Sequence, residues 1–148
     1  MAGLRFFSVY QGYGGAEEHK GEYANVIAQF ADDIANGEAP KLYGDGAQTR
    51  DFTHVADIVR GLVLAAEHRL DGVYNLGTGE AYDFNTVVEL LNDELGTAVE
   101  PEYVENPIPE DVYVHDTCAD ASKMHEATGW APQIDFEDGI QRVCQQYK

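Results

Sequence analysis

Hydrophobic residues recur along this chain with two spacings, one typical of strands and one typical of helices. Residues 4–10, 40–43, 72–76 and 99–104 are short runs rich in branched, aromatic or other apolar side chains, which favour buried strands. Residues 23–34, 58–68, 85–95, 120–128 and 136–147 place apolar side chains every three or four positions, which predicts amphipathic helices. Residues 112–117 alternate weakly, as in an edge strand. This alternation is typical of an α/β or α+β domain.

Polar residues and glycines mark the expected ends of these elements. Asp57 is well placed as the N-cap of the helix that begins near Ile58, and either Asn85 or a Thr86–Glu89 capping box would begin the helix at 85–95. Asn36-Gly37, Gly96 and Gly129 are the expected helix stops. Residues 44–46, Gly-Asp-Gly, predict a tight reversal after the strand at 40–43.

Arg50 stands between that reversal and the apolar segment 52–55. Its planar guanidinium can form two parallel charge-assisted hydrogen bonds with a phosphate or a carboxylate. The alternative is an ion pair with Asp45 or Asp51, and the spacing by itself favours this alternative.

The charge of the chain narrows its possible partners. Its 148 residues fit one domain, and a hydrophobic fraction of 44% is compatible with a packed core. Only 9 Lys and Arg stand against 27 Asp and Glu, giving a net charge of −18. Such a charge argues against a nucleic acid or an anionic membrane as partner, because both need positive charge. It is typical of adaptation to high salt, which screens the repulsion.

Other sequence features indicate a cytoplasmic protein. We find neither a run of about 18 apolar residues nor a basic and then apolar leader, so we expect no membrane span and no signal peptide. Cys118 and Cys144 form no CxxC pair and are expected to be reduced packing residues. The five histidines lack a metal-ligand spacing, so no metal site is expected.

Four collinear blocks carry a family resemblance. They are Gly3-Leu4-Arg5-Phe6-Phe7-Ser8-Val9-Tyr10, the stretch from Leu42 to Ile58, Gly72-Val73-Tyr74-Asn75-Leu76-Gly77-Thr78-Gly79, and Ala119-Asp120-Ala121-Ser122-Lys123 through Gly129-Trp130. Together they resemble the C-terminal half of extended short-chain dehydrogenases, the NAD-dependent nucleotide-sugar epimerases and dehydratases, of the UDP-glucose 4-epimerase kind.

The resemblance implies an α/β fold that is the C-terminal portion of such an enzyme. Residues 1–10 and 52–79 resemble late strands and helices of the Rossmann sheet, whereas 22–51 and 80–148 resemble the small α/β substrate-binding subdomain. The N-terminal Rossmann half is missing from this sequence, and residues 1–148 would form one compact substrate-binding portion.

The catalytic parts of that family are absent from these residues. The reaction needs a Tyr-x-x-x-Lys pair, and none of the nine tyrosines has Lys four positions later. The glycines at 12–15 and at 77–79 do not match the GxGxxG fingerprint of a dinucleotide site. We therefore expect no catalytic residue here, no activity from this chain alone, and NAD only as the cofactor of the parent family.

The resemblance does assign binding residues, and it reverses the preference at Arg50. Phe7 would lie near the nicotinamide, and Ser8, where the family usually has Asn, would contact the substrate. Arg50 would bind the diphosphate. The remaining substrate-binding residues would be Val26, Lys41, Leu42 and Tyr43, with the last three against the nucleotide base. Core packing is the alternative for Tyr43, and His115 is a possible substitute for a second family arginine that is missing here.

We therefore expect the substrate-binding part of an NAD-dependent nucleotide-sugar epimerase. The alternatives are a fragment of a nucleotide-sugar 4,6-dehydratase or heptose epimerase, or a noncatalytic module that binds sugar nucleotides or self-associates. The edges of the strand at 4–10 would be exposed, and exposed edges pair with other copies, so a homo-oligomer is expected.

Overall fold

Strands and helices alternate along the chain in the computed structural model, which describes residues 1–11, 17, 19–20 and 24–148. The glycine-rich stretch at 12–15 and the predicted start of the first helix at Tyr23 lie outside the described residues. The strands are β1 (Ala2–Phe6), β2 (Val9–Tyr10), β3 (Lys41–Tyr43), β4 (Thr49–Arg50), β5 (Thr53–His54), β6 (Gly72–Leu76), β7 (Tyr82–Asp83) and β8 (Glu102–Val104). The helices are α1 (Val26–Ala35), α2 (Val55–Glu67), α3 (Phe84–Leu95), α4 (Ser122–Thr128) and α5 (Phe136–Cys144), and a 3-10 turn follows at Gln145–Tyr147.

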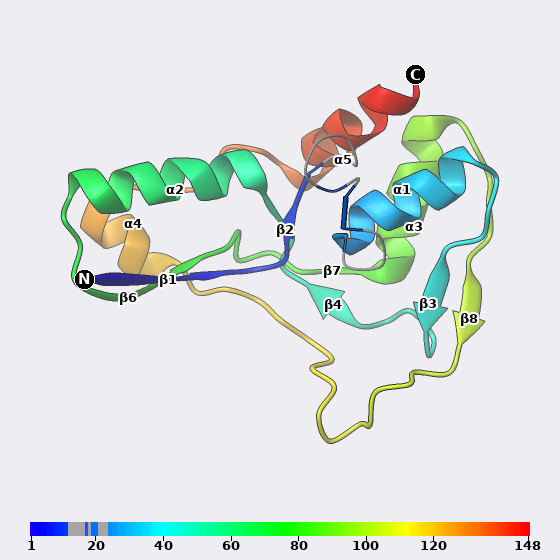
Figure 1. Ribbon diagram of the computed structural model, residues 1–148, viewed down its shortest axis with the longest axis horizontal. Helices are drawn as coiled ribbons and strands as arrows, with labels where there is room; N and C mark the ends of the chain where they lie inside the picture. Colours follow the sequence, from blue (N-terminus) through cyan, green and yellow to red (C-terminus); the bar gives the residue numbers. More distant parts are fainter. Residues whose placement is uncertain (12–16, 18, 21–23) are drawn as a thin grey trace.

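These elements form two lobes, which lie at opposite ends of the long axis in Figure 1. The small lobe contains β1, β6, α2 and α4, and its core gathers around Trp130, Met124 and Leu76. The large lobe contains α1, α3, α5, β3 and β8, and its core includes Ile27 and Leu91. Alternating strands and helices confirm the predicted α/β class. The predicted subdomain boundaries stay a prediction.

The strand expected at 4–10 is broken in the middle, so that prediction was wrong in extent. β1 pairs in parallel with β6 in the small lobe, whereas β2 pairs in parallel with β5. Between them Ser8 adopts a φ of 25°, in the left-handed region that non-glycine residues seldom enter. The kink redirects the chain from one lobe to the other and places Ser8 at the junction.

The N-cap of α2 is His54 and not Asp57, which corrects the prediction. The His54 Nδ1 accepts the backbone N–H of Ala56 at 3.2 Å. Asp57 lies buried in the first turn, where its carboxylate accepts the backbone N–H groups of Gln133 and Ile134, each at 3.1 Å. A contact across 76 residues therefore decides the position of Asp57, and local capping rules cannot reveal such a contact.

Other local predictions were also tested by the structure. Gly96 and Gly129 end α3 and α4 in the left-handed conformation with φ of 67° and 73°, as predicted. The cap of α3 is instead Asp83, which accepts the Thr86 N–H at 2.7 Å, so neither predicted cap is used.

Two predictions near the C-terminal third were wrong. Residues 112–117 make one isolated bridge, between Thr49 and Asp116, and form no strand. Cys144 is buried as expected of a packing residue, but Cys118 is exposed. Among the described residues, every helix is too short or too polar to cross a bilayer.

Candidate functional site

A pocket of about 310 Å³ opens beside Arg50, at the junction of the two lobes. It draws on the β1–β2 kink, the start of α1, β4 and the start of α3. The lining residues of this Arg50 pocket are Ser8, Val9, Tyr10, Asn25, Val26, Arg50, Phe52 and Phe84. Three residues that the resemblance assigns to substrate binding, Ser8, Val26 and Arg50, therefore line one pocket although they are far apart in sequence.

Five further residues line the Arg50 pocket that were not assigned to it from the sequence, and two of them, Asn25 and Phe84, begin helices. Asn25 is the N-cap of α1, and its side-chain oxygen accepts the Ala28 N–H at 2.9 Å. Phe84 begins α3 and packs edge-on against Phe30, with ring centroids 6.0 Å apart. A polar residue before an apolar helical stripe was the available signal for Asn25, whereas nothing local distinguishes Phe84 from a core residue.

The guanidinium of Arg50 is fixed by main-chain oxygens. Its Nη1 donates to the carbonyl oxygens of Thr49 and His115 at 2.7 and 2.8 Å, and its Nη2 donates to that of Val114 at 2.7 Å. The group also lies 5.9 Å from the ring centre of Phe84 and 5.6 Å from that of Tyr113. No ion pair joins Arg50 to Asp45 or Asp51, so the alternative that spacing favoured is wrong.

Three of the five N–H bonds of this guanidinium are used in that way. The Nε–H and one Nη2–H have no acceptor among the described residues. A side chain that is held in position and keeps two donors is suited to an anion with several oxygens, such as a phosphate.

Asp51 anchors the segment that carries Arg50. Its side chain is fully buried and accepts backbone N–H groups from Thr78 and Gly79 at 2.8 Å and from Ala119 at 3.0 Å. The Thr78 hydroxyl donates to the same carboxylate at 2.6 Å. This one carboxylate therefore joins β4 to the end of β6 and to the approach to α4. An acidic residue within an apolar segment was the available sequence signal for this anchoring role.

The residues of β3 are divided between the core and a second hollow. Leu42 is fully buried, so its side chain belongs to the core and only its main chain can meet a ligand. Lys41 and Tyr43 line an open hollow of about 400 Å³, which we call the Tyr43 hollow. Its other lining residues are Gln29, Phe30, Asp33, Glu38 and Ala39. Helix α1 connects the two sites, because Val26 lines the Arg50 pocket and Phe30, one turn later, lines the Tyr43 hollow.

The Tyr43 hollow is acidic and does not favour anions. Burial, with the neighbouring carboxylates of Glu38 and Asp32, raises the pKa of Asp33. Lys41 opposes that shift only in part. Tyr43 is 37% exposed, so its ring is accessible and is not a core residue. An aromatic face beside hydrogen-bonding groups is suited to a flat, uncharged ring such as a nucleobase.

Phe7 lies next to the glycine-rich segment at 77–79 and does not line either site. Its N–H donates to the Leu76 carbonyl at 3.1 Å. A Cβ on Gly77 would lie 2.3 Å from the Cβ of Ala119 and 3.2 Å from that of Phe7, so this glycine permits close packing.

The hydrogen bonds of residues 78 and 79 bear on whether this glycine-rich segment could bind the pyrophosphate of NAD. The N–H groups of Thr78 and Gly79 are already donated to Asp51, so this segment cannot cradle a pyrophosphate.

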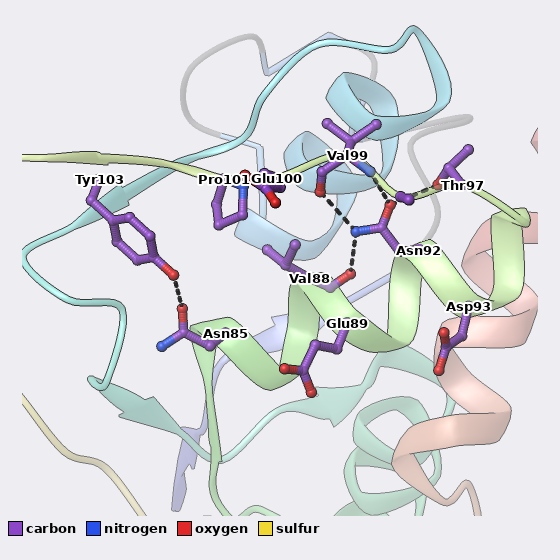
Figure 2. Close-up of a pocket in the computed structure, with 11 residues that line it drawn as sticks. Asn85, Val88, Glu89, Asn92, Asp93, Thr97, Val99, Glu100, Pro101 and Tyr103 are labelled. Atoms are coloured by element: carbon purple, nitrogen blue, oxygen red, sulfur yellow. Dashed lines mark hydrogen bonds between the residues drawn. The ribbon is translucent and has the colours of Figure 1, made fainter.

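A larger hollow, about 660 Å³, lies elsewhere, between α3 and the segment that leads to β8 (Figure 2). Figure 2 shows that the side chain of Asn92 makes its hydrogen bonds within the protein. Its amide donates to the Val88 and Val99 carbonyls at 3.1 and 3.0 Å. Its oxygen accepts the Val99 N–H at 2.8 Å, and Asn85 accepts the Tyr103 hydroxyl at 2.8 Å. These amides hold the α3–β8 connection, and the other polar groups of this hollow, which we call the Asn92 hollow, include the carboxylates of Glu89, Asp93 and Glu100, which do not favour an anionic ligand.

General-base and metal chemistry find little support in the described residues. Tyr10 lines the Arg50 pocket, but burial raises its pKa, so the phenol stays neutral and is not a base. Within residues 1–11, 17, 19–20 and 24–148, no group of three or more His, Cys, Asp or Glu side chains could hold a metal ion.

Proteins of known families match almost the whole of this chain. The model of the GDP-mannose 4,6-dehydratase family matches residues 7–143. A putative UDP-glucose 4-epimerase of Methanocaldococcus jannaschii is 34% identical over 140 residues, which are 95% of this chain and 43% of that protein. An ADP-L-glycero-D-manno-heptose-6-epimerase of Alkalilimnicola ehrlichii is 35% identical over 150 residues, 95% of this chain and 45% of that protein.

The fold agrees with that of a solved epimerase. The structure of UDP-glucose 4-epimerase from Thermotoga maritima, determined with UDP-glucose, superimposes with a TM-score of 0.85 at 31% identity and covers 99% of this chain and 45% of that one. Other solved relatives hold NAD. This chain thus spans about half the length of the relatives that it matches, as expected of a partial α/β unit. It belongs to the family of NAD-dependent nucleotide-sugar epimerases and dehydratases.

Proposed function

We propose that this chain supplies the nucleotide-sugar-binding part of an NAD-dependent epimerase of the UDP-glucose 4-epimerase kind. The observation that carries the proposal is the Arg50 pocket, where Ser8, Val26 and Arg50 come together from three separate segments. The family resemblance assigns all three residues to substrate binding, and no spacing rule requires them to meet.

Arg50 is the proposed diphosphate ligand. Two of its N–H bonds remain for phosphate oxygens, while three carbonyl oxygens and two rings fix the plane of the group. Because the side chain is already ordered, binding loses little side-chain entropy. Ser8 would add a short hydroxyl donor, and Val26 and Phe84 would supply apolar walls beside the sugar.

The Tyr43 hollow is the proposed site of the nucleotide base. The Tyr43 ring offers an accessible aromatic face, and the main chain of Leu42 and the Lys41 side chain offer hydrogen bonds to the edge of the base. The acidic surroundings of Asp33 favour a neutral ring over a phosphate there. The base and the diphosphate would thus lie on either side of the first turn of α1.

The hydride chemistry is proposed to need residues outside this chain. NAD, when bound in a complete enzyme of this family, accepts and returns a hydride. Phe7 would lie near the nicotinamide in such an enzyme. We propose no catalytic residue here and no activity from this chain alone. We propose that the protein acts in a salt-rich cytoplasm, because salt screens the repulsion that a net charge of −18 produces.

Calorimetric titration with UDP-glucose, UDP and NAD in molar KCl tests the proposal. We expect UDP and UDP-glucose to bind in the absence of NAD, and Arg50→Ala to weaken binding by about 10- to 100-fold, since hydrogen bonds to charged groups contribute about 1.5–3 kcal/mol. Arg69→Ala removes an exposed arginine from the small lobe and is the matched control, with unchanged affinity.

Two results would contradict the proposal. One is a folded chain that binds none of the UDP ligands. The other is binding that Arg50→Ala leaves unchanged. Titration with ADP and dTDP alongside UDP separates a 4-epimerase acting on UDP-sugars from heptose epimerases and dehydratases that use other nucleotides.

A further inference from the structure

A stretch without helix or strand runs from the end of β8 to the start of α4, and it passes outside both lobes in Figure 1. We call residues 105–118 of this stretch the strap. Only Asn106, Tyr113 and Thr117 of the strap are half-buried, and the other residues are exposed. Burial of apolar surface therefore contributes little to holding the strap in place. Such a segment opens at a low cost in free energy unless specific polar contacts hold it.

Two consecutive residues of β4, Thr49 and Arg50, hold the strap. The Thr49 N–H donates to the His115 carbonyl at 3.0 Å, and the Thr49 carbonyl accepts the Thr117 N–H at 3.2 Å. The Thr49 hydroxyl donates to the Asp116 carboxylate at 2.7 Å. Every hydrogen bond that we find between the strap and the rest of the described chain involves Thr49 or Arg50. The attachment therefore depends on one short strand.

Arg50 belongs both to this attachment and to the pocket. Its guanidinium donates to the carbonyl oxygens of Val114 and His115, and its Cζ lies 5.6 Å from the centre of the Tyr113 ring, within range of a cation–π contact. The same side chain lines the Arg50 pocket. The N–H bonds that it does not donate to carbonyl oxygens are those proposed for the diphosphate. One side chain is therefore shared by the strap and the proposed ligand.

The attachment leaves two polar groups unsatisfied. The side-chain nitrogen of Gln48, next to Thr49, and the hydroxyl of Thr117 are buried without a hydrogen-bond partner in the described part of the chain. Burying a polar group without a partner costs free energy. This cost lowers the stability of the attached strap, so a further contact at Arg50 can shift the balance between the attached and the released strap.

We propose that attachment of the strap and binding of a diphosphate at Arg50 stabilise each other, with Tyr113 as a positioning residue. The inference rests on the proposed function, because its ligand is the diphosphate of that same site. Fixing the guanidinium costs side-chain entropy, and this entropy is lost only once when the strap and the diphosphate both hold the group. Each therefore strengthens the binding of the other, by the same factor, as linkage requires.

The charge of the strap opposes this coupling at low salt. The strap contains four carboxylates and no Lys or Arg; the carboxylates belong to Glu105, Glu110, Asp111 and Asp116. They repel a diphosphate. In molar KCl the Debye length is about 3 Å, so most of this repulsion is screened and the contacts at Arg50 dominate.

Calorimetric titration of the full 148-residue chain with UDP in molar KCl tests the role of Tyr113. Tyr113→Leu should weaken UDP binding by about three- to tenfold, because it removes the ring that fixes the guanidinium. Tyr113→Phe keeps the ring and should restore the affinity to within about twofold of the wild type. Tyr103→Leu is the matched control and should leave the affinity unchanged, because Tyr103 is 54% exposed and its hydroxyl donates to Asn85.

Amide hydrogen exchange measures attachment of the strap directly. UDP should slow exchange of the Thr49 and Thr117 N–H groups by about threefold or more, whereas uridine, which has no phosphate, should not. The Thr97 N–H, which donates to the Asn92 carbonyl at 3.0 Å, is the internal control and should not change. In the chain without ligand, Tyr113→Leu should speed exchange at Thr49 and Thr117 and leave Thr97 unaffected.

The outcomes separate this inference from the proposed function. UDP binding that leaves exchange at Thr49 and Thr117 unchanged would overturn the coupling, and so would UDP binding that Tyr113→Leu does not weaken. The proposed function would stand in both cases. A folded chain that binds no UDP would instead overturn the proposed function and the coupling together.

Discussion

The buried carboxylate of Asp51 is expected to be a major source of stability. Asp51→Asn keeps the size of the side chain but replaces one oxygen by an NH2 group. One oxygen of Asp51 accepts the Thr78 N–H and hydroxyl, and the other accepts the Gly79 and Ala119 N–H groups. Whichever way the amide turns, at least one backbone N–H loses its acceptor.

The magnitude follows from these contacts. A buried donor left without an acceptor costs about 1–3 kcal/mol, and the remaining hydrogen bonds lose the extra strength that a charged acceptor provides. A loss of about 3 kcal/mol or more is therefore expected. This is a large fraction of the about 5–15 kcal/mol that stabilises a typical domain.

Urea denaturation followed by the fluorescence of the buried Trp130 measures this loss. With a slope of about 2 kcal/mol per molar urea, the midpoint for Asp51→Asn should fall by about 1.5 M. Asp45→Asn is the control, because Asp45 is exposed and its carboxylate accepts only the Ala47 N–H among the described residues. Equal midpoints for Asp51→Asn and the wild type would contradict the stabilising role of the Asp51 carboxylate.

Three further predictions concern glycine packing, pH and thiol reactivity. Gly77→Ala should destabilise the fold by about 1–3 kcal/mol in the same assay, because its Cβ would overlap that of Ala119, whereas Gly3→Ala, with 3.7 Å to its nearest neighbour, should be tolerated. Burial, and then the charge of Arg142, lowers the pKa of His54, so its contribution to stability is present above about pH 6.5 and is lost as the pH falls toward the folded-state pKa. His54→Asn keeps a cap that does not titrate and should flatten the pH profile of unfolding between about pH 7 and 5; an unchanged profile would count against this cap. Burial raises the pKa of Cys144 to about 11, so an aromatic disulfide reagent at about pH 8 should modify Cys118 alone, and loss of the fast reaction in Cys118→Ser would verify the assignment.

The periodic parts of the sequence predicted the fold well. Helices α1, α3 and α5 carry the expected apolar stripes, and β3 and β6 lie where branched and aromatic runs placed them. These elements succeed because the pattern that buries one face is local in sequence. The glycines that end α3 and α4 succeed for the same reason, since a left-handed residue is required at those positions.

The errors occur where a distant contact overrides the local pattern. Asp57 resembles an N-cap, but its carboxylate is held by Gln133 and Ile134 inside the first turn of α2. The run at 4–10 resembles one strand, but its two ends pair with different strands and Ser8 takes up the kink. At Arg50, the sequence could not show that carbonyl oxygens of residues 114 and 115 would replace the expected ion pair.

The most direct test of the central claim is to map where UDP-glucose binds on this chain. In amide and guanidinium NMR spectra recorded in molar KCl, we expect UDP-glucose to shift the signals of Ser8, Val26 and the Arg50 Nε–H. The side-chain amides of Asn85 and Asn92 in the Asn92 hollow should not move. Shifts confined to Asn85 and Asn92, with Arg50 unaffected, would contradict the assignment of the nucleotide-sugar site.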